Sequence, residues 1–279
     1  MSDSQASPTP IRRTSRPHAR RRLLRTILLA GGILGASLSG FLPIAFAKRA
    51  RLRPPGALDE HDFLASCIKC GQCVQVCPVQ AIRLSDLVDG FGVGVPHIEP
   101  RDQACDFSCD AGQCILACPT GALTYRKPSF FPTRAGAMLP ALPILKAKAK
   151  DPDPNVNFRE RMGLARLVRP EACRAAQGKD FHGLARGAAF RGRMRYTDVD
   201  RWKPIRIAER RYDRDLCDLC VTECPIKGAL TMETFTTPEG NRHRQPVVHD
   251  ACVGCGVCEM ICPVETPCIV VEGRAVWKA

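Results

Sequence analysis

Four groups of cysteines recur along this chain of 279 residues, and each group ends in Cys-Pro. The first and fourth groups share one spacing, with two, two and three residues between successive cysteines. The second group has gaps of three, four and three residues, and the third has three close cysteines and one far upstream. In chain order the groups are Cys67, Cys70, Cys73 and Cys77; Cys105, Cys109, Cys114 and Cys118; Cys173 with Cys217, Cys220 and Cys224; and Cys252, Cys255, Cys258 and Cys262. Thiols repeated in this way predict metal chemistry.

The spacing two, two, three followed by proline is typical of the bacterial [4Fe–4S] ferredoxin run. Three close thiolates can wrap one face of a cluster, and glycines such as Gly71 and Gly254 let the loop curl. A short helical turn is expected at residues 74–76, and the proline ends it because the residue before proline avoids the helical region. The last cysteine then points away from its own loop and ligates the other cluster of a pair.

This exchange of the last cysteine within each pair of groups yields a hypothesis of four [4Fe–4S] clusters with sixteen cysteine ligands. The predicted sets are Cys67, Cys70, Cys73 and Cys118; Cys105, Cys109, Cys114 and Cys77; Cys173, Cys217, Cys220 and Cys262; and Cys252, Cys255, Cys258 and Cys224. Cys268 is left over, and we interpret it as a buried thiol that packs as a small hydrophobic residue.

Three other uses of the cysteines compete with this one. Disulfides suit an exported chain, but seventeen is an odd number and the repeated runs make an awkward disulfide framework. Zinc ribbons use two Cys-x-x-Cys pairs and require neither a third close cysteine nor Cys-Pro. Covalent haem needs Cys-x-x-Cys-His, which does not occur in this sequence. A zinc- or disulfide-stabilised binding module without redox function stays an alternative of another class.

The residues after each Cys-Pro repeat as well, with alanine followed by Ile or Leu, which predicts a short strand packed on each cluster. Two groups make one two-cluster unit, so four groups predict two duplicated units. The expected fold is α+β: two bacterial-ferredoxin-like two-cluster modules with short helices, small antiparallel hairpins and long irregular insertions. The boundaries are residues 57–126 for the first module, 127–158 for a Pro- and Lys-rich linker, and 159–272 for the second module.

The N-terminal residues 1–47 read as an export signal. Arg20 and Arg21 precede an uncharged stretch that runs from Thr26 and ends in Ala-Phe-Ala at Ala47. Paired arginines before an apolar segment and a small-x-small end indicate twin-arginine export to the periplasm. Twenty-two uncharged residues are also long enough for a membrane anchor, so an uncleaved leader would tether the protein.

The formal net charge is +13, but about half of it lies in the leader, and export removes the chain from nucleic acid. Residues 174–216 form a basic insertion with twelve Lys or Arg and six Asp or Glu, interpreted either as a solvated surface segment or as a docking face for an acidic redox partner. The six histidines are scattered, and the sequence contains no Rossmann fingerprint, phosphate loop or Gly-x-Ser-x-Gly. The chain is therefore predicted to carry electrons and to bind no substrate of its own.

Several segments resemble the NapG/MauM family of ferredoxin-type proteins. The resemblance covers most of residues 51–272 and is carried by Arg51-Leu52-Arg53-Pro54-Pro55-Gly56-Ala57, by Cys67-Ile68-Lys69-Cys70-Gly71-Gln72-Cys73, by Arg161-Met162-Gly163-Leu164-Ala165 and by Ala251-Cys252-Val253-Gly254-Cys255-Gly256. The second group departs from the family pattern in its first gap, and the 43 residues between Cys173 and Cys217 are more than the family usually has.

The resemblance implies a periplasmic protein with four [4Fe–4S] clusters held by the sixteen cysteines above. It implies a polytopic iron–sulfur membrane partner of the NapH/MauN kind, electron entry from quinol oxidation, and exit to a periplasmic c-type cytochrome or oxidoreductase. The NapG branch is linked to periplasmic nitrate reduction and the MauM branch to methylamine utilisation. An alternative in the same chemistry is the electron-transfer subunit of a periplasmic molybdenum oxidoreductase.

Overall fold

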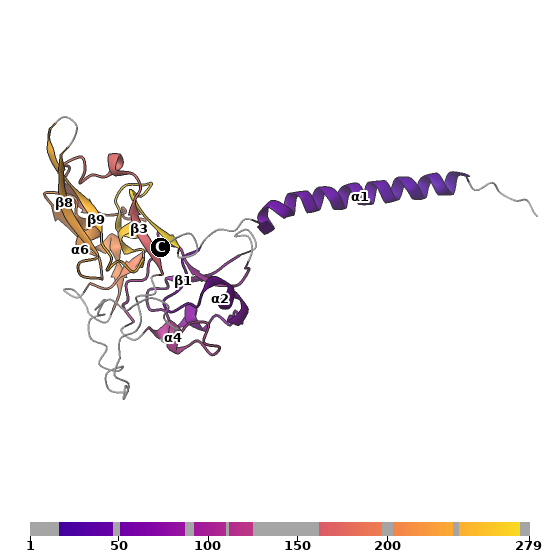
Figure 1. Cartoon of the computed structure of the whole chain (residues 1–279), viewed down its shortest axis with the longest axis horizontal. Coiled ribbons are helices and arrows are strands. Elements are labelled where there is room, and N and C mark those ends of the chain that lie inside the picture. The colour runs from indigo at the N-terminus through magenta and orange to yellow at the C-terminus, as the bar shows by residue number, and fades with distance from the viewer. Residues whose placement is uncertain are drawn as a thin grey trace, which may run out of the picture. The chain divides into compact units, whose positions relative to one another are not determined.

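The computed structural model describes residues 17–46, 51–86, 92–109, 112–124, 162–196, 203–236 and 240–273. The predicted linker, 127–158, lies outside these ranges. The chain divides into two compact units, Met1–Ala47 and Lys48–Ala279. The second unit contains all seventeen cysteines. It combines short helices with two-stranded antiparallel sheets (Figure 1), as expected for an α+β ferredoxin-like protein.

The first unit is a helix, α1 (Pro17–Phe46), that contains the arginine pair Arg20 and Arg21. Its side chains between Arg20 and Ser37 are exposed. Among the described residues, no helix is both long enough and apolar enough to cross a membrane. The end of the predicted cleavage site, Ala47, lies outside the described part of the chain.

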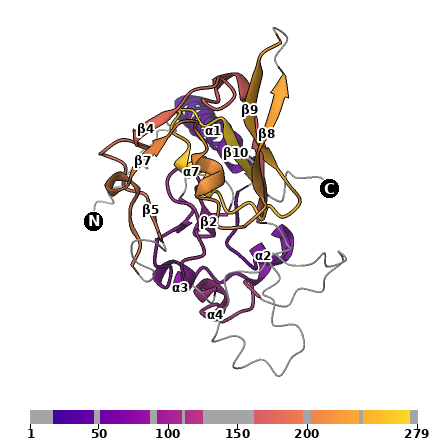
Figure 2. The ribbon, with the colours of Figure 1, turned by 90° about the vertical axis from the view of Figure 1, so that its left-hand side faces the viewer.

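The first half of the body is built from short elements around the first two cysteine groups. Strands β1 and β2 pair antiparallel, with Ile82 opposite Ile98, and both of these side chains are buried. Figure 2 shows α3 beside α4, the two helical turns that carry Cys73 and Cys114. The elements are α2 (Glu60–Ser66), α3 (Gln72–Gln75), β1 (Ile82–Leu84), β2 (Pro96–Ile98) and α4 (Gln113–Leu116).

The Arg-Pro-Pro-Gly segment at the start of the body packs against several elements of this half. The buried guanidinium of Arg53 donates to Glu60 Oε2 at 2.9 Å and to the Pro96 carbonyl at 2.9 Å. Gly56 has φ +75°, and a Cβ there would lie 2.6 Å from the Thr124 carbonyl oxygen. Glycine is therefore required at this position for both its conformation and its lack of a side chain.

The second half repeats the plan with longer strands. Strand β10 pairs antiparallel with β3, and β8 pairs antiparallel with β9. The β3–β10 pair brings the segment before Cys173 to the end of the fourth group, because Leu167 lies opposite Ile269. The elements are β3 (Gly163–Leu167), the 3₁₀ turn η2 (Pro170–Ala172), α6 (Leu219–Thr222), β8 (Leu230–Thr236), β9 (Arg242–Val248), α7 (Val257–Ile261) and β10 (Ile269–Gly273).

The described residues of the basic insertion, 174–216, pack against the rest of the body. The interpretation as a solvated surface segment is therefore wrong for these residues. Its strands pair β4 with β7 and β5 with β6, and Ile207 and Met194 are almost fully buried. Tyr196 and Tyr212 lie buried together, with their hydroxyl oxygens 3.0 Å apart. The bounds are β4 (Phe181–Leu184), β5 (Arg193–Met194), β6 (Ile205–Arg206), η3 (Ile207–Glu209) and β7 (Arg211–Arg214).

Arginines of this insertion join the two halves of the body. The backbone N–H of Arg195 donates to the buried Asp106 carboxylate at 2.7 Å, and its guanidinium donates to the Ser108 carbonyl at 3.0 Å. Arg186 donates to the carbonyls of Arg101 and Met260, at 3.1 and 3.0 Å, and stacks on Phe190. Several of the basic side chains thus donate hydrogen bonds to backbone carbonyls. The number of positive charges in the segment therefore overstates how many are available to bind an acidic partner.

Two of the small elements differ from the sequence expectation. The helical turn of the first group is Gln72–Gln75 instead of residues 74–76, because Gly71 in the left-handed conformation (φ 74°) starts it directly after Cys70. Strands follow Cys-Pro at Ile82, Leu230 and Ile269 as predicted. After Cys118, the residues described up to Thr124 form only an isolated bridge, between Ala57 and Leu123.

Two glycines from separate motifs of the second half touch each other. A Cβ on Gly254 would lie 2.2 Å from the carbonyl carbon and oxygen of Gly163, and one on Gly163 would lie 2.3 Å from the Glu272 carbonyl oxygen. The Met162 N–H donates to the Val253 carbonyl at 2.9 Å beside this contact. Backbone therefore packs directly on backbone where the loop of the fourth group meets β3.

We predict that Gly254→Ala destabilises the protein more than the matched variant Gly228→Ala. The two glycines have similar φ, +70° and +76°, but nothing lies within 4 Å of a Cβ on Gly228. Gly228→Ala should cost about 1–2 kcal/mol for the left-handed conformation alone. Gly254→Ala adds a backbone clash of about 1–3 kcal/mol.

The measurement is thermal unfolding of the full, iron-loaded chain followed by near-UV circular dichroism. The midpoint of Gly254→Ala should lie several degrees below that of Gly228→Ala, at about 2–4 °C per kcal/mol. Equal midpoints would show that the backbone contact at Gly163 is not close in solution.

Candidate metal centres

The three close cysteines of the first group line one pocket together with a thiol from the second group. These are Cys67, Cys70, Cys73 and Cys118. Phe63 also lines this pocket and is fully buried. Burial and the nearby sulfurs of the other three raise the pKa of Cys73 to about 11. The last cysteine of the second group therefore faces the loop of the first, as the exchange pattern predicts.

The local backbone conformation orients these cysteine side chains. Lys69 and Gly71 both have positive φ, which curls the loop between Cys67 and Cys73. The Leu123 N–H donates to Cys118 Sγ at 3.4 Å, so the turn after Cys-Pro orients that sulfur. Backbone N–H groups of this kind stabilise a thiolate in a site that holds a metal.

The second set consists of Cys105, Cys109, Cys114 and Cys77. Burial raises the pKa of Cys105 well above its usual range, and the sulfurs of the other three, which lie near it, raise it further. The Ala81 N–H donates to Cys77 Sγ at 3.3 Å, so here too the turn after Cys-Pro orients the last sulfur. The irregular gaps of the second group thus still place its thiols together.

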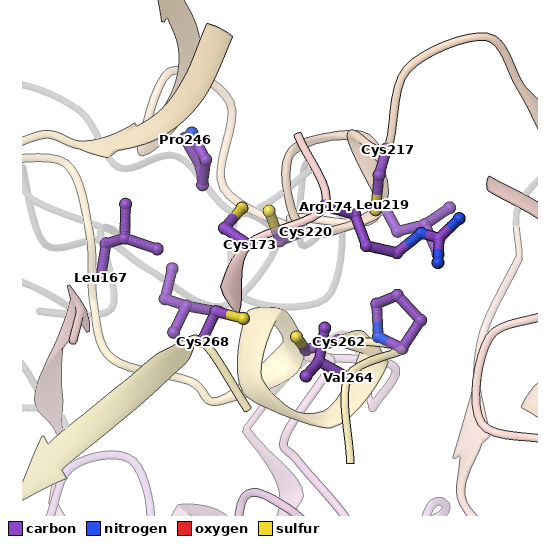
Figure 3. A pocket seen from close by; sticks show the side chains of 12 residues that line it. Leu167, Cys173, Arg174, Cys217, Leu219, Cys220, Pro246, Cys262, Val264 and Cys268 are labelled. Carbon is purple, nitrogen blue, oxygen red and sulfur yellow. The ribbon is translucent and has the colours of Figure 1, made fainter. Parts of the chain in front are cut away.

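The third set is assembled across the longest separation in sequence. Cys173, Cys217, Cys220 and Cys262 line a second pocket (Figure 3). Cys173 arrives from η2, and the Cys217 N–H donates to the Lys179 carbonyl at 3.0 Å, which ties the two ends of the insertion. The pockets of the first and third sets are both lined mainly by apolar side chains around four cysteines of a predicted set.

The fourth set is the most enclosed. Cys252, Cys255 and Cys258 are each at most 7% exposed, and Cys224 joins them from the third group. Burial, followed by the nearby sulfurs of Cys255 and Cys252, raises the pKa of Cys258 well above its usual range. Gly256, with φ 94°, starts α7 and packs on Pro100, where a Cβ would lie 2.7 Å from the Pro100 Cβ.

One arginine from the first half supports the loop of Cys262. Arg101 donates to the carbonyls of Glu259, Cys262 and Val264 at 2.7, 2.9 and 2.6 Å, and to that of Glu265 at 2.8 Å. A cation at these carbonyls satisfies the C-terminal end of α7 and interacts favourably with its dipole. The position of Cys262 therefore depends on the junction of the two halves.

Neighbouring sets follow one another in a spatial order that differs from the chain order. The sulfurs of Cys73 and Cys114 link the first and second sets. The Cys105 N–H donates to the Cys255 carbonyl at 3.2 Å, which places the second set against the fourth. Cys220 of the third set lies near Cys258 of the fourth. The spatial order is first, second, fourth, third.

The donor chemistry fits a cationic iron–sulfur group better than the alternatives considered from the sequence. All seventeen cysteines are free, so none forms a disulfide. Four thiols around one apolar pocket repel one another as thiolates unless a metal supplies positive charge. Among the described residues, no group of three or more His, Cys, Asp or Glu is arranged to hold a single metal ion. In a [4Fe–4S] cluster each thiolate binds its own iron. The structure brings each predicted set together, and ligation of iron stays a prediction.

Cys268, the leftover thiol, is 2% exposed, as expected for a buried cysteine. Its place was not foreseen: it lines the pocket of the third set beside Cys262. Burial, followed by the nearby sulfurs of Cys262 and Cys173, raises its pKa to about 12. The available signal was its position after Cys-Pro, where the other groups have alanine.

Comparison with known proteins supports this reading of the cysteines. The profile of the 4Fe-4S dicluster domain matches residues 66–122 and 214–266. The ferredoxin-type protein NapG of Escherichia coli K12 is 33% identical over 267 residues, which cover 93% of this chain and 88% of NapG. The methylamine utilization ferredoxin-type protein MauM of Methylorubrum extorquens is 32% identical, covering 88% of this chain and 84% of MauM. MauM of Paracoccus denitrificans is 33% identical, covering 82% and 74%. No solved structure matches the chain significantly.

We predict that double variants distinguish exchanged sets from sets formed within each group. Cys67→Ala with Cys118→Ala removes two ligands of one set and should lower iron from about sixteen to about twelve per chain. Cys67→Ala with Cys77→Ala damages two sets and should leave about eight. Anaerobic iron and sulfide analysis measures both. The opposite ranking would show that each group keeps its own fourth cysteine.

Proposed function

Since the chain belongs to the NapG/MauM family of ferredoxin-type proteins, we propose that it is a periplasmic relay with four [4Fe–4S] clusters. It takes electrons from a polytopic membrane partner that oxidises quinol and passes them to a periplasmic c-type cytochrome or oxidoreductase. In this role it is an electron carrier and a component of a quinol dehydrogenase complex, with no catalytic site of its own. The observation that carries the proposal is the continuous row of four cysteine sets.

The first set is the end of the row suited to exchange with a partner, because part of it lies at the surface. Cys70 of the first set is exposed, and Ile68 beside it is 64% exposed. Leu84, 41% exposed, approaches the same loop at Gly71. The fourth set lies inside the row, and three of its cysteines are buried. Clusters in these sets would each take up and release single electrons.

The chain's own residues set the environment at each position of the row. Backbone N–H groups of Ala81 and Leu123 reach the sulfurs of Cys77 and Cys118. Arg101 places positive charge near Cys262 in the third set. Hydrogen bonds to sulfur, burial and nearby charge are the factors by which a protein tunes a cluster. Burial differs among the four positions, so we expect different reduction potentials.

The first prediction of this proposal is the metal content of the anaerobically purified chain. About sixteen irons and sixteen acid-labile sulfides are expected, with coupled electron paramagnetic resonance signals after reduction. About twelve irons would mean that the third set, with the remote Cys173, does not ligate. Zinc without iron would overturn the relay and favour a zinc-stabilised binding module.

The second prediction concerns export. In a bacterium with a twin-arginine pathway, the wild-type chain should reach the periplasm, and Arg20→Lys combined with Arg21→Lys should retain it in the cytoplasm. Arg12→Lys combined with Arg13→Lys is the matched control, because this second arginine pair is not followed directly by the uncharged stretch. Cell fractionation with immunoblotting measures both. Unchanged export of the first variant would refute the twin-arginine assignment.

A further inference from the structure

Two arginines from separate segments hold the loop that ends in Cys262, and we call them the arginine pair. Arg101 donates to four carbonyls, among them those of Glu259 and Cys262 at 2.7 and 2.9 Å. Arg186, from the basic insertion, donates to the Met260 carbonyl at 3.0 Å and to the carbonyl of Arg101 itself at 3.1 Å. The two guanidinium groups therefore bind consecutive carbonyls of α7.

In the part of the chain that the structure describes, neither member of the pair forms an ion pair with a carboxylate. The Glu259 carboxylate accepts the N–H of Val271 at 2.6 Å instead. Asp102, the residue after Arg101, pairs with Arg83 at 2.7 Å. A part-buried positive charge is costly unless a negative charge lies nearby, and a second cation beside it adds to the cost.

The metal site of the third set supplies a negative charge at the right place. Four thiolates around one cluster leave the whole group with a net negative charge. The Arg101 nitrogen bound to the Cys262 carbonyl lies at most about 8 Å from the Cys262 sulfur, because that carbonyl and that sulfur belong to one residue. This separation is below the Debye length of about 10 Å at 0.1 M salt, so salt does not abolish the attraction.

We propose that Arg101 and Arg186 are positioning residues of the third set, which hold the Cys262 loop and raise the reduction potential of a cluster bound there. The inference rests on the proposed function, since it concerns a cluster in this set. Reduction adds one negative charge, so a nearby cation stabilises the reduced state more than the oxidised state. The arginine pair thus makes the third set a favoured site for an electron at its end of the row.

Other cations near the sets differ from the arginine pair. Lys69 lines the pocket of the first set but is exposed, so water and salt screen its charge. Arg174 lines the pocket of the third set, but its guanidinium lies 3.6 Å from the Asp180 carboxylate. Arg210 lies 3.8 Å from the carboxylate of Glu223, which precedes a ligand of the fourth set. We therefore expect the largest effect of a single charge at the third set, from the arginine pair.

The test is an anaerobic redox titration of the full-length, iron-loaded protein, followed by electron paramagnetic resonance. Cys173→Ala identifies the transition of the third set, because it removes a ligand of that set alone. In Arg101→Gln this transition should shift to lower potential by about fivefold in its equilibrium constant, or about 40 mV. Arg101→Lys keeps a point charge in place of the planar fork and should recover most of the shift. Arg186→Gln should lower the same transition by less.

Arg206→Gln is the matched control. Arg206 also donates to backbone carbonyls, those of Ala188 and Phe190 at 3.3 and 3.1 Å, but these belong to the insertion and not to a loop that carries a ligand. All transitions of this variant should coincide with those of the wild type.

The proposal is wrong if the third-set transition stays in place in both Gln variants of the arginine pair, or if Arg206→Gln lowers it equally. It is also wrong if Arg101→Lys and Arg101→Gln shift it by the same amount, because the charge then has no effect. If Arg101→Gln does not fold with its iron, Arg186→Gln decides: an unchanged third-set transition overturns the proposal. An iron-free wild-type protein would instead refute the proposed function itself.

Discussion

Four sulfurs from two or three distant segments must converge in each set, and most of the contacts in the body serve this requirement. No single stretch supplies a complete set, because the proline after each group turns its last cysteine toward a neighbouring loop. The remote segment is held by backbone contacts. For the third set, the β3–β10 ladder brings η2 and Cys173 to the strand that follows Cys262. Close glycine contacts are needed because a side chain at Gly254 would push this ladder from the loop of the fourth set.

Arginine side chains link the two halves of the body, which in other proteins a wide apolar core would hold together. The two halves contribute small elements with little aromatic content, and small domains bury too little apolar surface to be stable without additional links. Arg101 and Arg186 cross between the halves and donate to backbone carbonyls around α7. Helix α7 carries Cys258 of the fourth set and leads to Cys262 of the third set. The geometry of both sets therefore depends on how the two halves pack against each other.

The spatial order of the sets gives the row two ends that differ from each other. The first and third sets form the ends, and the enclosed fourth set lies between the second and third. The exposed Cys70 and Ile68 mark one end as a contact point for a partner. At the other end, a fifth thiol, Cys268, lines the same pocket as Cys262. The two ends therefore differ in chemistry as well as in exposure.

Cysteine spacing, Cys-Pro ends and flanking glycines depend on nearest neighbours along the chain, so they predicted the cofactor class and the strands at Ile82, Leu230 and Ile269. Contacts between distant segments could be found only in the folded chain. The spatial order of the sets, the arginine clamp at α7 and the place of Cys268 all depend on contacts between segments far apart in sequence. Such contacts leave no periodic pattern in the sequence. An arginine that donates to backbone carbonyls cannot be distinguished, from sequence, from one on a solvated surface.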